Sequence, residues 1–184
     1  MKYLLLFLII TLSSFSVKNG VTQDIPVKNL EFIKYVESHG RTIAPSYAKT
    51  NCVQFMDQIL MGYTHIDDIT SKRIYINQEM SFIKKLLEHN DSTIVAGVCW
   101  ALLASGKAFF VDPNGVGEKG VKKGDIIQYW QTDGFINGHC GIIYDETPEG
   151  YVLLSSHPDS HGYGKMNMYN KKMSGFKIFI VRLK

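Results

Sequence analysis

The spacing of the hydrophobic residues changes near residue 107, and that change constrains the fold more than any other feature. Upstream of it, apolar residues recur at helical spacing over 27–38, from residue 52 onward, over 78–89, and from 92 or 93 to 106. Gly40 is expected to stop the first of these helices, and Asn51 or Thr50 to cap the second. The stretch 64–76 favours neither a helix nor a strand.

Downstream of residue 107 the pattern is that of strands. β-Branched and aromatic residues predict strands over 125–130, 138–144, 151–155 and 176–183, after a short apolar run at 108–111 and a turn-rich loop at 112–124. The turn residues at 147–150 predict a hairpin between the strands on either side of them. Helices followed by such strands indicate an α+β fold, in which N-terminal helices pack on an antiparallel β-sheet.

Length and charge restrict the class of protein further. A chain of 184 residues fits about one domain. Hydrophobic residues at 45% and charged residues at 20% exclude a disordered chain and a coiled coil. The formal net charge of +3 is small and its basic residues are scattered, which argues against a nucleic-acid partner.

Residues 1–16 have the pattern of a secretory signal peptide. Lys2 precedes an apolar run at 4–12 that is too short to span a bilayer, which takes about 20 residues, and serines at 14 and 16 suit a cleavage site. We therefore expect 17–184 to form a single domain of a secreted or periplasmic protein without stable membrane insertion. A buried N-terminal helix or a retained anchor is the alternative.

The three cysteines, Cys52, Cys99 and Cys140, are an odd number for an exported protein. They cannot all pair, so at least one free thiol is expected, and a disulfide between two of them is the alternative. Cys52 opens a predicted helix, where free backbone N–H groups and the helix dipole stabilise a thiolate. A small buried hydrophobe is the usual fate of a free cysteine and is the competing interpretation of Cys52.

His139 lies between small residues in the strand predicted at 138–144. Because side chains alternate along a strand, Cys140 is expected to face away from His139, as a core thiol and a poor partner for a site. A lone histidine in a strand is more often structural than catalytic. The placement of Cys52 nevertheless makes His139 a candidate general base for that thiol.

A polar run at 155–161 ends the next strand and can supply the third group that fixes the tautomer of a base. His157 is our choice for this role, and Ser155, Ser156 and Asp159 are its rivals, because strand register is uncertain by one or two residues. Residues 161–164 are interpreted as a loop that lines a cleft.

The sequence resembles the NlpC/P60–CHAP superfamily in four features taken together. These are a cysteine that opens a helix, the run GDIIQYW at 124–130, the run GHCGII at 138–143 and a polar residue one strand later. The resemblance covers roughly residues 45–165. It implies a papain-like fold and a cysteine peptidase or amidase that cuts amide bonds of peptidoglycan. The sequence departs from the usual Asp-Cys-Ser-Gly pattern at Cys52, and members of the CHAP type more often use an acid or an amide where His157 stands.

Carried over by position, Cys52 is implied as the nucleophile, His139 as the general base and His157 as the group that orients it. The backbone N–H of Cys52 would hold the oxyanion, and Tyr47 could donate a second hydrogen bond, although loop packing explains Tyr47 as well. The expected partner is a peptidoglycan stem peptide or a similar peptide. A non-catalytic module that binds wall peptide or a protein on the same fold is the alternative function.

No cofactor and no metal are expected. The pattern G-x-G-x-x-G at 115–120 lacks the helix that a dinucleotide site needs after it, so we interpret it as a turn. A zinc site from His157, His161, His139 and Cys140 is disfavoured by strand alternation and by the lack of paired cysteine motifs.

Overall fold

The computed structural model describes residues 24–74, 97–131, 137–169 and 176–184. The expected signal peptide at 1–16 and the helix predicted at 78–89 lie outside these ranges. No helix within the described ranges has the length and apolar character to cross a membrane.

The helices lie mostly where the hydrophobic spacing predicts them. Their bounds are α1 (Val27–Ile43), α2 (Cys52–Thr64), α3 (Asp68–Ile74) and α6 (Gly97–Ala104). The prediction that Gly40 stops α1 is wrong, because the helix continues through it and the ring of Tyr163 packs on the space a side chain would fill. A Cβ atom at position 40 would lie 2.5 Å from a ring carbon of Tyr163. The ambiguous stretch after residue 64 contains α3.

Within the described ranges, six strands form one antiparallel sheet. They are β1 (Ala108–Phe110), β2 (Ile126–Gln131), β3 (Asn137–Thr147), β4 (Gly150–His157), β5 (Gly162–Tyr169) and β6 (Phe176–Leu183). Their order across the sheet is β1-β6-β2-β3-β4-β5, and every neighbouring pair is antiparallel. The α+β class and the β3–β4 hairpin are therefore confirmed. The loop expected at 161–164 is wrong, because residues 162–164 are the first residues of β5, which pairs with β4 along its length.

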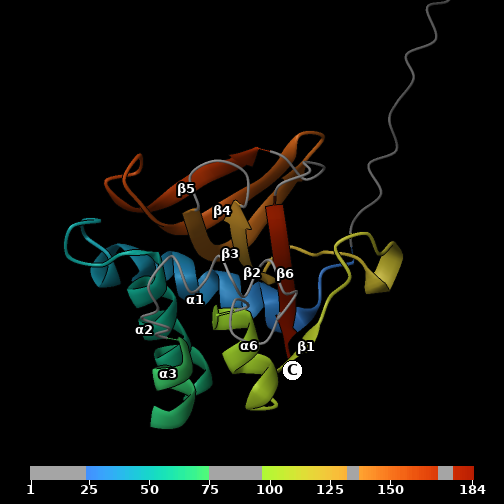
Figure 1. The fold of residues 1–184 in the computed structure, drawn as a ribbon, viewed down its shortest axis with the longest axis horizontal. Helices are drawn as coiled ribbons and strands as arrows, with labels where there is room; N and C mark the ends of the chain where they lie inside the picture. The colour runs from blue at the N-terminus through green and yellow to red at the C-terminus, as the bar shows by residue number, and fades with distance from the viewer. Residues whose placement is uncertain (1–23, 75–96, 132–136, 170–175) are drawn as a thin grey trace, which may run out of the picture.

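The helices pack on one face of the sheet, as Figure 1 shows. A core between the two layers joins α1, α2 and α6 to the inward side chains of the strands, among them Ile126, Cys140, Ile142, Leu154 and Val181. A second, smaller core lies on the opposite face and includes Ile127, Ile143, Leu153 and Ile180, with Val111 and Val121 from the loop before β2. Alternation along the strands thus buries both faces of the central sheet.

Asp125, just before β2, connects distant parts of the chain. Its buried carboxylate accepts two hydrogen bonds from Arg182 of β6, at 2.7 and 2.9 Å, and one from Asn29 of α1, at 2.9 Å. It also accepts from the backbone N–H of Lys122. This network ties α1 and β6 to the loop that leads into β2.

Candidate active site

The sequence around Cys52 builds a well-capped helix start. The Asn51 side chain accepts a hydrogen bond from the Gln54 backbone N–H, and the Gln54 side chain accepts one from the Asn51 backbone N–H, each at 2.9 Å. This reciprocal capping box fixes Cys52 as the first residue of α2, as predicted. It engages the N–H groups of Asn51 and Gln54 rather than that of Cys52. The thiol therefore sits at the positive end of the helix dipole.

The loop before α2 is anchored to the sheet. The Thr50 hydroxyl donates to the Ile43 carbonyl at the end of α1, and the buried Ser156 hydroxyl of β4 donates to the Thr50 carbonyl. In the same region the Tyr163 N–H donates to the Ala44 carbonyl at 2.9 Å. These bonds hold the loop before α2 against the end of β4 and the start of β5, which the polar run at 155–161 connects.

Cys52 is 7% exposed, and the side chains of Cys140 and His139 both act on the pKa of its thiol. The hydrogen bond from Cys140 lowers the pKa of Cys52 most strongly. Burial opposes it, while the hydrogen bond and positive charge of His139 lower the pKa further. The net effect keeps the pKa of Cys52 far below that of an ordinary thiol, so the site favours a thiolate.

Cys140 is the neighbour that strand alternation led us to discount. It is fully buried in the core between helices and sheet, as expected of a core thiol, and it also acts on the pKa of Cys52. The physical reason is that α2 lies on the face toward which Cys140 points. The hydrogen bond to Cys52 and burial both raise the pKa of Cys140, so it stays a neutral thiol and donates its S–H.

His139 is 7% exposed and is held by groups on β2. The buried Gln128 side chain donates to the His139 carbonyl at 3.0 Å, and the ring of Tyr129 lies 5.8 Å from the imidazole between centroids. The Nε2 atom of His139 is buried without a hydrogen-bond partner among the described residues. Gln128 was not singled out from the sequence, although a buried amide in a β-strand is a signal that calls for a partner.

His157 lies beside His139 but is not hydrogen-bonded to it. Their rings meet edge to face at 5.2 Å between centroids. Burial, followed by the charge of His139, lowers the pKa of His157, which favours its neutral form. Asp159 approaches His157 Nδ1 at 3.4 Å and its backbone N–H donates to the same atom at 3.2 Å, but its side chain is 88% exposed.

The remaining candidates take other positions. The Ser155 hydroxyl donates to the Cys140 carbonyl at 2.7 Å, so it stabilises the backbone of β3 and does not orient the His139 imidazole. The ring of Tyr47 lies 6.5 Å from that of His157. Burial raises the pKa of Tyr47 most, and the negative charge of Cys52 raises it further, so its hydroxyl stays protonated. Among the described residues, no group of three or more His, Cys, Asp or Glu side chains is placed to hold a metal ion.

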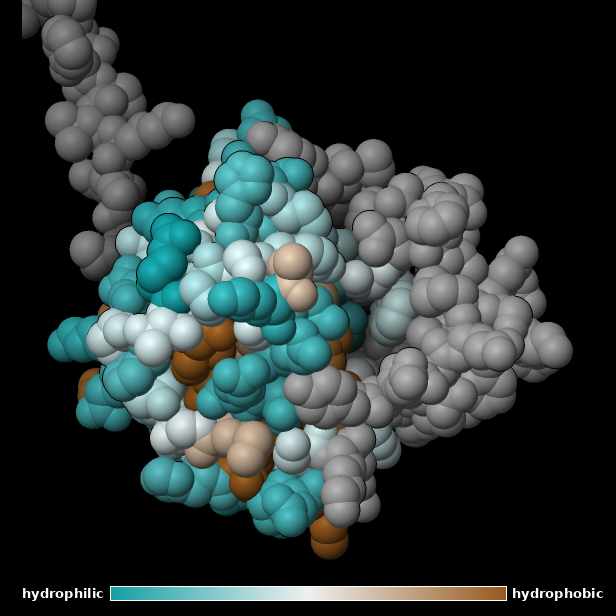
Figure 2. Space-filling view, turned by 90° about the vertical axis from the view of Figure 1, so that its left-hand side faces the viewer, coloured by the Kyte–Doolittle hydropathy of each residue, from teal (hydrophilic) through white to brown (hydrophobic). Residues whose placement is uncertain are grey.

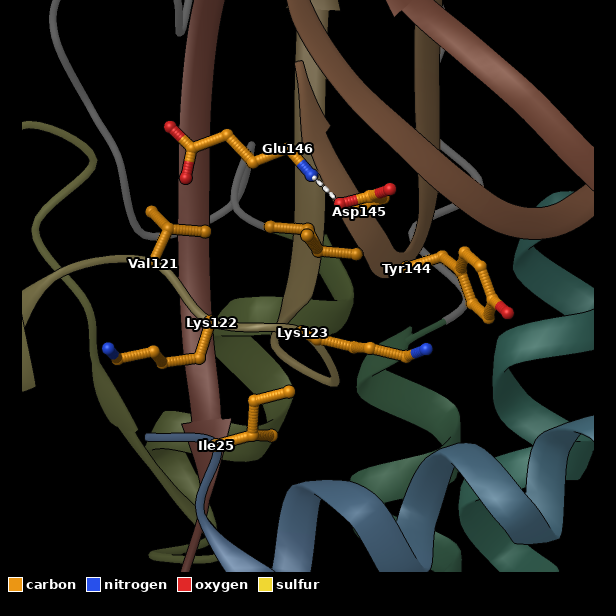
Figure 3. Close-up of a pocket in the computed structure, with 8 residues that line it drawn as sticks. Ile25, Val121, Lys122, Lys123, Tyr144, Asp145 and Glu146 are labelled. Carbon is orange, nitrogen blue, oxygen red and sulfur yellow. Dashed lines mark hydrogen bonds between the residues drawn. The ribbon is translucent and has the colours of Figure 1, made fainter. Parts of the chain in front are cut away.

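On the side of the molecule that carries α2 and α3, the visible surface is mainly hydrophilic. Figure 2 views the side on which Figure 1 shows α2 and α3, and hydrophobic residues form only small separate areas there. A pocket of about 420 Å³ lies elsewhere, between the loop before β2 and the end of β3. Figure 3 shows Lys123 extending toward Tyr144 at one side of it and Glu146 donating a backbone hydrogen bond to Asp145 at another. Neither Cys52 nor His139 lines this pocket.

No protein-family model, curated protein or solved structure matches this chain.

Proposed function

We propose that this chain is an exported cysteine hydrolase with a papain-like fold of the NlpC/P60 type, which cleaves amide or peptide bonds in peptidoglycan stem peptides or similar peptides. One observation carries the proposal: the buried thiol of Cys52 lies at the start of a capped helix, and the imidazole of the buried His139 on the neighbouring sheet lowers its pKa. A thiolate stabilised by a helix and paired with an imidazole is the arrangement that activates a cysteine nucleophile.

The chemistry follows from these positions. The Cys52 thiolate attacks the carbonyl carbon of the scissile amide, and the backbone N–H of Cys52 donates to the developing oxyanion, because the capping box uses other N–H groups. His139 gives its proton to the leaving amine. It then takes a proton from the water that releases the thioester, so the same imidazole acts first as acid and then as base.

A non-catalytic module that binds wall peptide or a protein partner is the second candidate, and one observation favours it. Catalytic imidazoles are held by a third group, yet His139 Nε2 has no partner among the described residues and His157 meets His139 only ring to ring. In a binding module, Cys52 and His139 would serve only as parts of the recognition surface.

The test is digestion of purified peptidoglycan by the wild-type protein and by Cys52→Ala, with the fragments identified by mass spectrometry. We expect new peptide ends with the wild type and none with Cys52→Ala. Cys99→Ala is the matched control, because Cys99 is an equally small buried thiol that donates to the Phe179 carbonyl at 3.3 Å and is not among the groups that shift the pKa of Cys52. Equal turnover by Cys52→Ala and wild type would exclude Cys52 as the nucleophile, and binding of the peptide without cleavage by the wild type would favour the binding module.

A further inference from the structure

A buried amide on β2 reaches the backbone of His139. Gln128 is 4% exposed, and its side-chain Nε2 donates to the His139 carbonyl at 3.0 Å. In the pairing of β2 with β3, Gln128 lies opposite Cys140 and Tyr129 lies opposite His139, so the amide crosses to the neighbouring position of the partner strand. This side-chain bond is additional to the pairing of the two strands, and it falls on the residue of β3 that the proposed chemistry uses.

A second buried side chain binds the next peptide group of β3. The Ser155 hydroxyl of β4 donates to the Cys140 carbonyl at 2.7 Å, and Ser155 is fully buried. The register of β3 with β4 begins only at residue 142, so this bond continues the attachment of the two strands toward the site. Two consecutive carbonyls beside the imidazole are thus each bound by a buried side chain, one from each neighbouring strand.

The start of α6 leaves room for the Gln128 amide. Gly97, the first residue of α6, has φ +47°, in the left-handed region that favours glycine. A Cβ atom at this position would lie 2.8 Å from Gln128 Oε1, so any side chain there would force the amide to shift. The amide therefore packs against α6 at its oxygen and holds the backbone of β3 with its nitrogen.

The imidazole of His139 has no hydrogen bond at one of its two nitrogens to orient it. Its Nε2 atom is buried without a partner among the described residues, and the ring of His157 meets it only edge to face, at 5.2 Å between centroids. A general acid or base must lie within hydrogen-bond reach of the proton that it transfers. The position of the His139 backbone therefore decides much of where the ring lies.

From this arrangement we propose that Gln128 is a positioning residue for His139: its amide fixes the peptide group next to the imidazole, and through it the placement of the ring in the site. Gln128 touches no substrate in this role and acts only through His139. Where it concerns turnover, the inference rests on the proposed hydrolase. Its effect on the thiol of Cys52 can be measured in a protein that never hydrolyses.

The first test is Gln128→Met, which keeps the approximate length and volume of the side chain but has no N–H to donate. We expect kcat for peptide hydrolysis to fall by as much as about 10²-fold with KM little changed, because a small displacement of a reacting group slows the chemical step. The pH midpoint of Cys52 alkylation by iodoacetamide should also rise, since His139 lowers the pKa of that thiol. A merely structural side chain would lower the free energy of unfolding and move neither quantity.

Ser105→Ala is the matched control. Ser105 also donates from its side chain to a backbone carbonyl, that of Leu102 at 3.1 Å, just beyond the end of α6. Urea unfolding should show a loss of stability in this variant, with kcat and the Cys52 midpoint as in the wild type. If Gln128→Met changes kcat and the midpoint no more than Ser105→Ala does, the amide is structural and the proposal is overturned.

Gln128→Glu keeps the test decisive if Gln128→Met does not fold. Burial raises the pKa of a glutamic acid, and only its protonated form can donate to the His139 carbonyl. The ratio of its kcat to that of the wild type at the same pH should therefore be highest at low pH and fall as pH rises through that raised pKa. A ratio that stays near one at every pH would show that the donated hydrogen bond is not needed and would overturn the proposal.

Hydrolysis and alkylation separate this inference from the proposed function. A wild-type protein that never hydrolyses peptide, but whose Cys52 midpoint rises in Gln128→Met, would remove the hydrolase and leave the link between the amide and the imidazole. Hydrolysis by the wild type, with kcat and the midpoint both unchanged in Gln128→Met, would do the reverse.

Discussion

The protonation of Cys52 is set by neighbours that act in opposite directions. Burial disfavours a charged sulfur, whereas the S–H of Cys140, the imidazole of His139 and the start of α2 favour it. One pKa unit corresponds to about 1.4 kcal/mol between the two protonation states. The stabilisation of the thiolate by these three neighbours together therefore outweighs the loss of its solvation on burial. The lowered pKa means that the thiolate is present well below pH 8.5, the region where an ordinary cysteine ionises.

Alkylation by iodoacetamide across pH measures this directly. Because a lowered pKa leaves the thiolate populated as pH falls, the rate at Cys52 should stay high below pH 8.5 and decline only as pH passes through the lowered pKa. Cys99 and Cys140 should remain unlabelled in the folded protein, since both are fully buried. Mass mapping assigns the labelled residue. A midpoint at or above pH 8.5 for Cys52 would contradict the proposed activation.

Replacement of His139 tests the other half of the pair. His139→Ala should lower kcat for peptide hydrolysis by about 10²–10⁴-fold, the usual worth of a positioned acid–base group. It should also move the alkylation midpoint of Cys52 toward that of an ordinary thiol, because both the hydrogen bond and the charge of the imidazole are lost. His161→Ala is the control, since His161 is exposed on the turn before β5. An unchanged midpoint in His139→Ala would show that the imidazole does not stabilise the thiolate.

The place of Cys52 at a helix start could be predicted from its neighbours in the sequence. The influence of Cys140 on the site could not, because it depends on how α2 packs on the sheet. The capping residues at 51 and 54 flank the cysteine in the sequence, so the helix start could be inferred without a structure. Strand alternation correctly separated Cys140 from His139, but it could not say on which face α2 lies. The influence of Cys140 on the pKa of Cys52 joins residues far apart in the chain, and no local pattern encodes it.

At the scale of elements, the strongly periodic segments were predicted best. The strand at 176–183 agrees with β6, and the predicted strands before it differ from β2, β3 and β4 by a few residues at their ends. β5 was missed because Gly162 and Gly164 suggest a loop, and as an edge strand it has neighbours on one side only. Met166 and Met168, two residues apart and both packed on the second core, were the available signal. Gly40 was misread for another reason: its partner, Tyr163, belongs to that missed strand.

The capping box of α2 leads to a prediction about this element. Asn51→Ala removes the side chain that accepts from the Gln54 N–H, and should lower the free energy of unfolding by about 1 kcal/mol. The loosened helix start should also raise the pKa of Cys52, seen as an upward shift of its alkylation midpoint. Urea unfolding and alkylation are measured on the same samples. Asn51→Ser, which keeps a capping oxygen, should retain most of both properties. Equal losses in the two variants would point to packing rather than capping.

At the scale of the whole molecule, a network around Asp125 connects the helical layer to the sheet. The run GDIIQYW at 124–130 begins beside this residue, and its carboxylate receives hydrogen bonds from α1, β6 and the preceding loop. Arg182 adds two bonds to the carbonyls of Glu118 and Gly120, which hold the loop that contains the glycine pattern at 115–120. That pattern therefore belongs to a structural turn held by Arg182.

Arg182 is the residue whose loss should destabilise the fold most. It is 7% exposed and forms a two-pronged pair with the fully buried Asp125. Arg182→Met leaves the carboxylate buried without its cation and frees two loop carbonyls, so the free energy of unfolding should fall by about 3–5 kcal/mol. Arg182→Lys keeps the charge but cannot form both bonds and should fall between Arg182→Met and wild type. Arg41→Ala, at an exposed arginine of α1, should change stability by no more than about 0.5 kcal/mol. Urea unfolding followed by circular dichroism measures all three, and a loss at Arg182→Met no larger than at Arg41→Ala would mean that the two layers are held by their hydrophobic cores alone.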